Sequence, residues 1–247
     1  MLFFHSLNKK VREYVSPKTG KLSPGGNYKV FNENWEACED DIFSIRASTT
    51  KGVGLCAWHL LDGKRTKNKT ECIKVGLIII DVDNQADGKD SDGNKIQKQE
   101  LDEDQLLELQ IVKQYCSFAY RSPSYQEEWP RFRLVFGLEI IDTEFYQWFT
   151  RNIAQQIPGS DVRATTVPNL FYGSKGVNPQ EEGFYLSENF IPETRIRDAY
   201  QHYLTIPKEG KEKGAAIDFL HTTLDPEGLE LTKLLSSSVK FILEGGQ

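Results

Sequence analysis

A short apolar run that ends in two aspartates constrains this chain more than any other feature. Residues 74–81 are rich in isoleucine and valine, and they lead directly into Asp81, Val82 and Asp83. A run of this length and composition predicts a buried β-strand. Residues two apart on a strand point to the same face, so we expect Asp81 and Asp83 to point together while Val82 packs the other way.

The segments after this strand alternate between helix and strand patterns. Residues 85–98 are rich in Gly, Asp, Lys and Asn, which predicts a loop. Apolar residues at helical spacing and acids in the first turn predict a helix over 101–116. Further patterns predict strands at 117–121, 131–138 and 169–173, and helices at 142–156, 194–204, 214–222 and 227–243.

The order β-α-β-β-α-β is that of ferredoxin-like folds, RRM domains and polymerase palms. We therefore predict an α+β fold with an RRM-like or palm-like core. Its subdomains are an N-terminal β-rich part over residues 1–73, a catalytic part over 74–192 and a helical C-terminal segment over 193–247. A sheet of this type has strand order 4-1-3-2 with antiparallel neighbours, and that order should bring five side chains to one edge: Asp81, Asp83, Arg131, Arg133 and Asp161.

Two neighbouring carboxylates repel each other unless a cation lies between them. Oxygen-liganded Mg²⁺ or Mn²⁺ is the natural partner, and two such ions can clamp both oxygens of a phosphoryl transfer. Arg131 and Arg133 share a strand face and suit a triphosphate. The small residues before Lys175 are similar to a phosphate-binding turn. The alternatives are that the aspartates only end a strand and that the arginines form surface salt bridges.

Other site classes do not match the sequence. The EF-hand frame and the haloacid-dehalogenase pattern both lack required residues after Asp81, and no P-loop is present. The four histidines, His5, His59, His202 and His221, are far apart in the sequence and form no zinc signature. Four widely spaced cysteines without a C-x-x-C pair favour a reducing, cytoplasmic compartment, and no apolar run reaches membrane-spanning length.

The net charge of −6 conceals an uneven distribution. Residues 81–110 hold ten acids and three bases, a net charge of −7, so the rest of the chain is close to +1. Two basic segments, one around Lys9 to Arg12 and one beginning at Lys64, favour a polyanionic partner, although a solvated surface is the ordinary alternative. The candidate DNA contacts in these segments are Lys9, Lys10, Arg12, Lys64, Arg65 and Lys67.

Three motifs in this order resemble those of the archaeo-eukaryotic primase superfamily, the primase-polymerases of plasmid and phage-type replication proteins. The first is the apolar strand ending in Asp81-Val82-Asp83. The second is residues 122–124 followed by the strand at 130–136, in which Arg131 and Arg133 stand where the family has Ser and His. The third is Asp161 followed by the aromatic strand and Ser174-Lys175.

The resemblance implies a template-directed primase or DNA polymerase that acts on single-stranded DNA and is nucleoid-associated. Its implied partners are a template, a primer, dNTPs or NTPs, and a replicative helicase. Asp81, Asp83 and Asp161 would hold two Mg²⁺ or Mn²⁺ ions, with Asp142 as a rival for the third acid. Residues implied to bind the nucleotide are Arg131, Arg133, Ser174 and Lys175.

Two other functions stay open at this point. One is a non-catalytic RRM-type module, in which Phe132 and Phe136 would stack on bases. The other is a palm-fold enzyme that acts on free nucleotides, such as a cyclase or a nuclease-like relative. Template dependence separates this enzyme from a polymerase.

Overall fold

A computed structural model of the chain describes residues 1–10, 32–64, 72–89, 91–92, 95–97, 101–140, 143–165, 169–174 and 183–207. The fold is α+β, as expected, and is built from two antiparallel sheets and a set of helices. The helices predicted at 214–222 and 227–243 lie outside the described residues.

Eleven strands are present in the described ranges. In chain order they are β1 (Phe3–Asn8), β2 (Glu36–Asp40), β3 (Gly54–Cys56), β4 (Trp58–Leu60), β5 (Cys72–Val82), β6 (Gln85–Lys89), β7 (Lys95–Gln97), β8 (Phe118–Arg121), β9 (Phe132–Ile140), β10 (Leu170–Phe171) and β11 (Tyr185–Leu186). The central sheet has the order β11-β8-β9-β5-β4, and the N-terminal sheet has the order β10-β3-β1-β2. Strands β6 and β7 form a separate hairpin.

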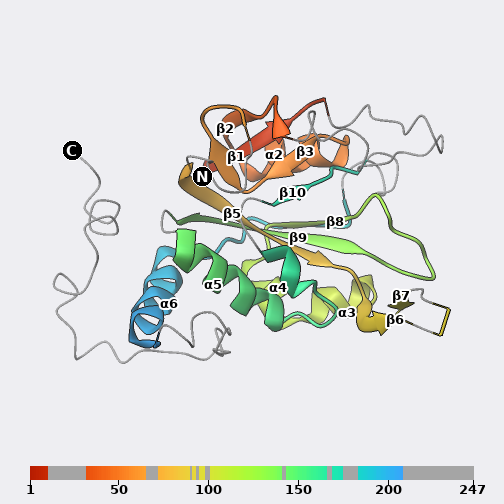
Figure 1. Ribbon diagram of the computed structural model, residues 1–247. Coiled ribbons are helices and arrows are strands. Elements are labelled where there is room, and N and C mark those ends of the chain that lie inside the picture. The colour runs from red at the N-terminus through yellow and green to blue at the C-terminus, as the bar shows by residue number, and fades with distance from the viewer. Residues whose placement is uncertain are drawn as a thin grey trace, which may run out of the picture.

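The helices in these ranges are α2 (Ile42–Thr50), α3 (Glu103–Glu108), α4 (Gln110–Tyr115), α5 (Thr143–Gln155), the 3₁₀ turn η2 (Val162–Thr165) and α6 (Glu193–Thr205). Figure 1 shows three layers, with the N-terminal sheet at the top, the central sheet in the middle and α3 to α6 below. Both faces of the central sheet are therefore covered. None of the described helices is long and apolar enough to span a membrane.

A glycine lets the two sheets approach each other closely. A Cβ atom added at Gly76 in β5 would lie 2.3 Å from the backbone nitrogen of Phe4 in β1. Real Cβ contacts are never this short, so a larger residue here would push the layers apart. The sheets consequently share one core, in which Phe118, Phe132 and Phe136 are fully buried.

Three of the predicted elements differ in the structure. The helix expected over 101–116 is interrupted at Leu109, which is extended with ψ 130. The interruption changes the phase of the buried positions, which become Leu106, Ile111, Val112 and Tyr115. Residues 85–98 contain the β6–β7 hairpin rather than only a loop, and Asp-Gly pairs of the kind found there are common in hairpin turns.

The third difference concerns the fourth strand of the expected core. The order β8-β9-β5 reproduces the predicted neighbours 2-3-1, but β10 pairs with β3 of the N-terminal sheet instead of with β5. The position beside β5 is taken by β4, which pairs Trp58 with Val75 and Leu60 with Cys72. The expected order 4-1-3-2 is therefore wrong, because a strand from the first 73 residues occupies that edge.

A capping box begins α3. The side chain of Asp102 accepts a hydrogen bond from the backbone of Gln105 at 2.8 Å, and the Gln105 side chain accepts one from the backbone of Asp102 at 3.0 Å. Replacing Asp102 with Ala is expected to lower the free energy of unfolding by about 1 kcal/mol. Urea denaturation followed by circular dichroism measures this loss. Asp104→Ala, in the same turn, is the control and should cost less than half as much; equal losses would contradict the capping role.

Candidate functional site

The end of β5 presents the two aspartates as the sequence predicts. The side chains of Asp81 and Asp83 are 19% and 18% exposed, whereas Val82 between them is fully buried. Asp81 lies opposite Arg133 in the pairing of β5 with β9, and Arg133 lies opposite Tyr120 in the pairing of β9 with β8. The three side chains thus form a row across the central sheet.

The loop after α5 brings Asp161 to the same place. The backbone N–H of Asp161 donates to the carbonyl of Asp81 at 2.8 Å, and Val82 forms an isolated bridge with Ser160. The carbonyl of Gly159 accepts hydrogen bonds from the backbone of Asp83 and Asn84, each at 3.0 Å. Asp161 is therefore adjacent to β5 as expected, although the strand that follows it belongs to the other sheet. Its rival Asp142 lies outside the described residues.

Arg133 is buried between the two sheets. Its Nε donates to Oδ1 of Asp81 at 3.0 Å, and its Nη1 donates to the backbone carbonyl of Tyr172. The guanidinium also lies 5.4 Å from the ring centroid of Phe171. Burial lowers the pKa of Arg133, but Asp81 and Tyr120 more than offset this effect, so the pKa is raised and the group stays charged. In the predicted four-stranded core, residues 171–172 would be distant from Arg133. In the structure they contact it at the start of β9.

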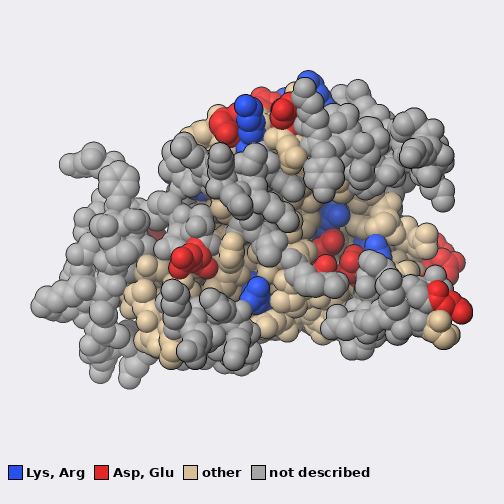
Figure 2. Space-filling view, viewed as in Figure 1, with Lys and Arg blue, Asp and Glu red and all other residues tan. Residues whose placement is uncertain are grey.

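Arg131 is nearer the surface and faces Asp83. Its Nη1 is 3.7 Å from Oδ1 of Asp83 and donates to the hydroxyl of Ser124 at 3.3 Å. Its guanidinium stacks over the ring of Trp129, 4.5 Å from the centroid. Figure 2 shows acidic and basic side chains next to each other below the N-terminal sheet. Arg133 of β9 therefore pairs with Asp81 near the end of β5, and Arg131, directly before β9, pairs with Asp83, directly after β5.

Asn84 fixes the turn at the end of the aspartate motif, a role that the sequence analysis did not assign. It is fully buried, has a positive φ of 46°, and its amide donates to the carbonyls of Leu101 and Pro130 at 2.8 and 2.9 Å. The indole of Trp129 donates to the carbonyl of Asp83 at 2.8 Å. The sequence could have indicated this role, because an asparagine directly follows the two acids that end the strand and Asn tolerates a positive φ.

Asn84→Ala is expected to lower the free energy of unfolding by about 2–3 kcal/mol, because two buried carbonyls lose their donor and alanine is strained at this φ. Asn84→Gly removes the strain but not the lost bonds, so its loss should be about 1 kcal/mol smaller. Thermal and urea unfolding of both variants test this. Equal stability of Asn84→Ala and the parent chain would contradict this role.

The three aspartates have the donor atoms that a divalent metal needs, but their carboxylates are not close enough together to hold one. Three carboxylates supply the oxygen ligands that Mg²⁺ and Mn²⁺ prefer. Within the described part of the chain, however, the one trio of potential ligands whose atoms all lie within 4.8 Å is His5, Cys38 and Asp40, in the N-terminal sheet. A metal at Asp81 and Asp83 would therefore require the carboxylates to turn away from their arginines.

The remaining candidate nucleotide ligands are placed differently. The backbone N–H of Ser174 donates to the carbonyl of Thr49 at 2.9 Å, and its side chain is buried. A Cβ added at Gly173 would lie 2.2 Å from the carbonyl oxygen of Val53. These small residues thus pack tightly against the end of α2, which explains them without a phosphate. Lys175 lies outside the described residues.

Lys9 and Lys10 follow β1 of the N-terminal sheet, whereas Lys64 follows β4 of the central sheet. Lys10 donates to the side chain of Asn34 at 2.6 Å, and the neighbouring Trp35 donates through its backbone to Gly63, next to the exposed Lys64. Lys9 forms an ion pair with Glu36 at 2.9 Å, which offsets its charge. The hydrogen bonds of Asn34 and Trp35 therefore connect two basic segments that are separate in the sequence. Arg12, Arg65 and Lys67 lie outside the described residues.

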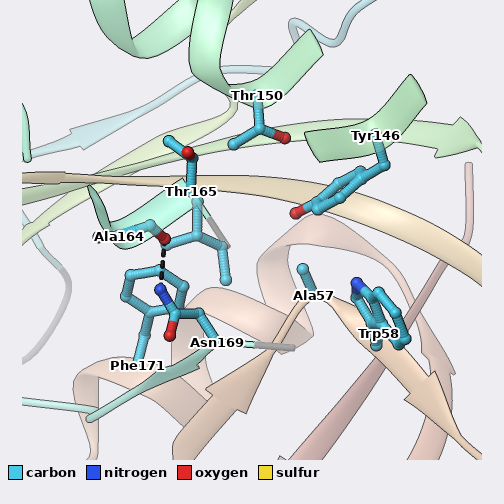
Figure 3. A pocket seen from close by; sticks show the side chains of 9 residues that line it. Ala57, Trp58, Tyr146, Thr150, Ala164, Thr165, Asn169 and Phe171 are labelled. Atoms are coloured by element: carbon cyan, nitrogen blue, oxygen red, sulfur yellow. Dashed lines mark hydrogen bonds between the residues drawn. The ribbon is translucent and has the colours of Figure 1, made fainter. Parts of the chain in front are cut away.

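A small pocket lies where β5, β10, η2 and α5 meet (Figure 3). It is lined by Ile79, two residues before Asp81, by Ala164 and Thr165 of η2, and by Phe171, while Tyr146 and Thr150 of α5 face it from the other side. The pocket has room for about one water molecule, so a nucleotide does not fit in it.

Comparisons with protein-family models, with curated proteins and with solved structures found no significant match to this chain.

Proposed function

We propose that this chain is a template-directed nucleotidyltransferase that makes or extends primers on single-stranded DNA. One observation supports the proposal: Asp81 and Asp83, at the end of β5, lie next to Arg133 and Arg131, at the start of β9, and the backbone of Asp161 is hydrogen-bonded to that of Asp81. Acids next to arginines at a partly exposed sheet edge suit a metal-bound triphosphate.

In this proposal the three aspartates hold divalent ions. Such ions, when bound, favour loss of the proton of the attacking 3′-hydroxyl and neutralise the leaving pyrophosphate. Asp83 is the better placed to release its arginine, since its pair with Arg131 is long, at 3.7 Å. Asp81 is held more firmly by Arg133 at 3.0 Å and also anchors Asp161 through its backbone carbonyl.

Arg131 and Arg133 would exchange partners when substrate binds. Without substrate they neutralise the aspartates, which would otherwise repel each other. With substrate, the guanidiniums would bind phosphate oxygens while the carboxylates are free to bind cations. Arg131 is 17% exposed and contacts Trp129 and Ser124, so its guanidinium is held in place and still partly open to solvent. Arginine cannot act as a proton donor or acceptor here as histidine can.

Burial of the aromatic residues disfavours the non-catalytic RRM-type module. That function needs exposed aromatics on the central strands, and Phe132 and Phe136 are fully buried. The N-terminal sheet covers one face of the central sheet and α3 to α6 cover the other (Figure 1). The expectation that these two phenylalanines stack on bases is therefore wrong.

Synthesis on defined single-stranded DNA templates tests the proposed function. Reactions with and without a primer, with dNTPs or NTPs, and with Mg²⁺ or Mn²⁺ should give products whose sequence follows the template. Products that form without template would favour the palm-fold enzyme acting on free nucleotides. Absence of product from a well-folded chain that binds DNA independently of metal would contradict a polymerase.

A further inference from the structure

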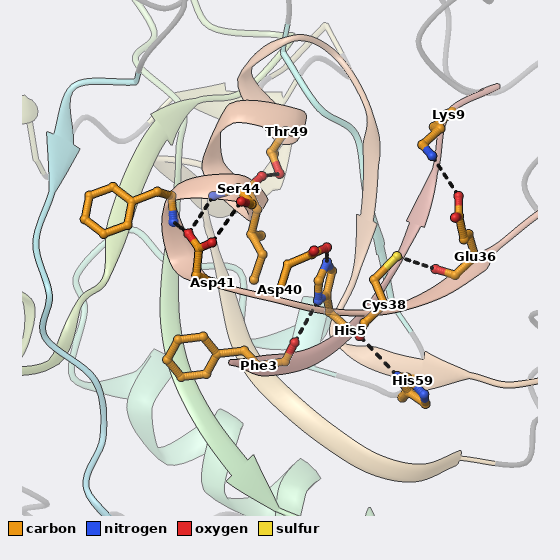
Figure 4. A network of polar contacts seen from close by, with 12 residues as sticks. Phe3, His5, Lys9, Glu36, Cys38, Asp40, Asp41, Ser44, Thr49 and His59 are labelled. Atoms are coloured by element: carbon orange, nitrogen blue, oxygen red, sulfur yellow. Dashed lines mark hydrogen bonds and ion pairs between the residues drawn. The ribbon is translucent and has the colours of Figure 1, made fainter. Parts of the chain in front are cut away.

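Three potential metal ligands converge in the N-terminal sheet, away from the aspartates of β5. His5 of β1 lies opposite Cys38 of β2, and Asp40 is two residues further along β2, on the same face. One ligand atom of each residue lies within 4.8 Å of the others (Figure 4). The sequence shows no zinc signature here because 33 positions separate the histidine from the cysteine, and only the pairing of β1 with β2 brings them together.

The hydrogen bonding of His5 leaves one ring nitrogen facing this cluster. Its Nδ1 lies 3.0 Å from the carbonyl oxygen of Phe3, which can only accept, so Nδ1 carries the proton. Nε2 of the neutral ring is then an acceptor. It is buried, has no hydrogen-bond partner in the described structure, and lies 3.4 Å from Oδ2 of Asp40.

Two acceptors this close need a positive charge between them. The thiol of Cys38 does not supply a proton, because it donates to the carbonyl of Glu36 at 3.2 Å. A metal ion fits this place, because a ring nitrogen of His5, the thiol of Cys38 and the carboxylate of Asp40 all lie within 4.8 Å of one another. Proteins usually orient a metal-binding histidine in this way, with the ring nitrogen that does not bind the metal donating a hydrogen bond to a carbonyl oxygen.

We propose that His5, Cys38 and Asp40 form a zinc site that ties the edge strand β2 to β1. Imidazole, thiolate and carboxylate together suit Zn²⁺ rather than Mg²⁺. Two ligands about 2.0–2.1 Å from a tetrahedral zinc ion lie about 3.3 Å apart, close to the observed separation of Nε2 and Oδ2. The side chain of Asp40 is 39% exposed, so an ion can enter from solvent and water can take the fourth position.

Binding of the ion would deprotonate Cys38 and release that proton to solvent. The site is distinct from the proposed nucleotidyltransferase centre, whose donors are carboxylates alone. Asp83→Ala should therefore leave zinc binding unchanged.

Titration of the metal-free full chain with Co²⁺ tests the site, since a Co²⁺–thiolate bond gives a charge-transfer absorption band. We expect one equivalent to bind with this band and to be displaced by Zn²⁺. Cys38→Ser should lose the band. The control Cys56→Ser, on the neighbouring strand β3 opposite Ser6, should keep it. A thiolate band that is absent from the parent chain, or that persists in Cys38→Ser, would overturn the proposal.

Asp40→Asn provides a second variant, at a partly exposed position where folding is not at risk. We expect it to weaken Zn²⁺ binding by about tenfold or more, measured by competition with a chromophoric chelator. It should also reduce the rise in melting temperature that Zn²⁺ gives the parent chain. Unchanged affinity and an unchanged melting shift would show that Asp40 is not a ligand and would overturn the three-residue site.

Discussion

Replacing Asp83 with Ala is expected to abolish primer synthesis while the chain keeps its fold and its affinity for single-stranded DNA. The pair of Asp83 with Arg131 is 3.7 Å long, whereas that of Asp81 with Arg133 is 3.0 Å, so we expect a smaller loss of stability than for Asp81→Ala. Loss of a metal-binding carboxylate removes several kcal/mol of transition-state stabilisation, which corresponds to a rate lower by about 10³-fold or more. Single-turnover extension of a labelled primer measures this loss.

The matched control is Asp104→Ala, an exposed acid of the first turn of α3. It changes the net charge by the same amount and should keep full activity. DNA binding measured by fluorescence anisotropy at several salt concentrations should be similar in both variants, because neither acid contacts the template in this proposal. Synthesis by well-folded Asp83→Ala within about tenfold of the parent rate would refute the assignment of Asp83.

Asp81→Ala is expected to abolish synthesis and, unlike Asp83→Ala, also to destabilise the fold. It leaves the guanidinium of Arg133, which is 9% exposed, without its carboxylate. Arg133 stays charged when buried, so its desolvation is no longer offset, and the free energy of unfolding should fall by about 3 kcal/mol. Urea denaturation should show a loss below about 1 kcal/mol for Asp83→Ala.

A double variant separates the lost ion pair from the lost volume. Replacing Arg133 with Met in the Asp81→Ala background removes the uncompensated charge and keeps an unbranched side chain between the sheets. Part of the lost stability should return, while synthesis stays absent. If Asp81→Ala and Arg133→Met instead destabilise additively, the pair is not coupled, and Arg133 contributes through the bond to Tyr172 and the contact with Phe171 alone.

Local patterns were sufficient for much of the site. The apolar run predicted β5, and its period of two predicted that Asp81 and Asp83 share a face while Val82 is buried. The register of β5 with β9 placed Arg133 opposite Asp81, in agreement with the expected antiparallel neighbours. These features depend on residues that are near in the sequence or on one strand pairing with strong apolar signals.

Longer-range features were decided by tertiary packing. The sequence could not show that β10 joins the N-terminal sheet or that β4 takes the edge beside β5, because strands of two or three residues carry almost no pairing information. The helical period alone predicts one continuous helix. The break at Leu109 therefore depends on which side chains the core accommodates.

Periodicity and composition were enough to predict the α+β class, the strand that ends in the two aspartates, and the gathering of these acids with two arginines. Tertiary packing selected the neighbouring strands, and with them the contact of Arg133 with Phe171 and the convergence of His5, Cys38 and Asp40. The physical reason is that a hydrophobic period specifies which face of a strand is buried. It does not specify the neighbour, which is selected by packing between residues far apart in the chain.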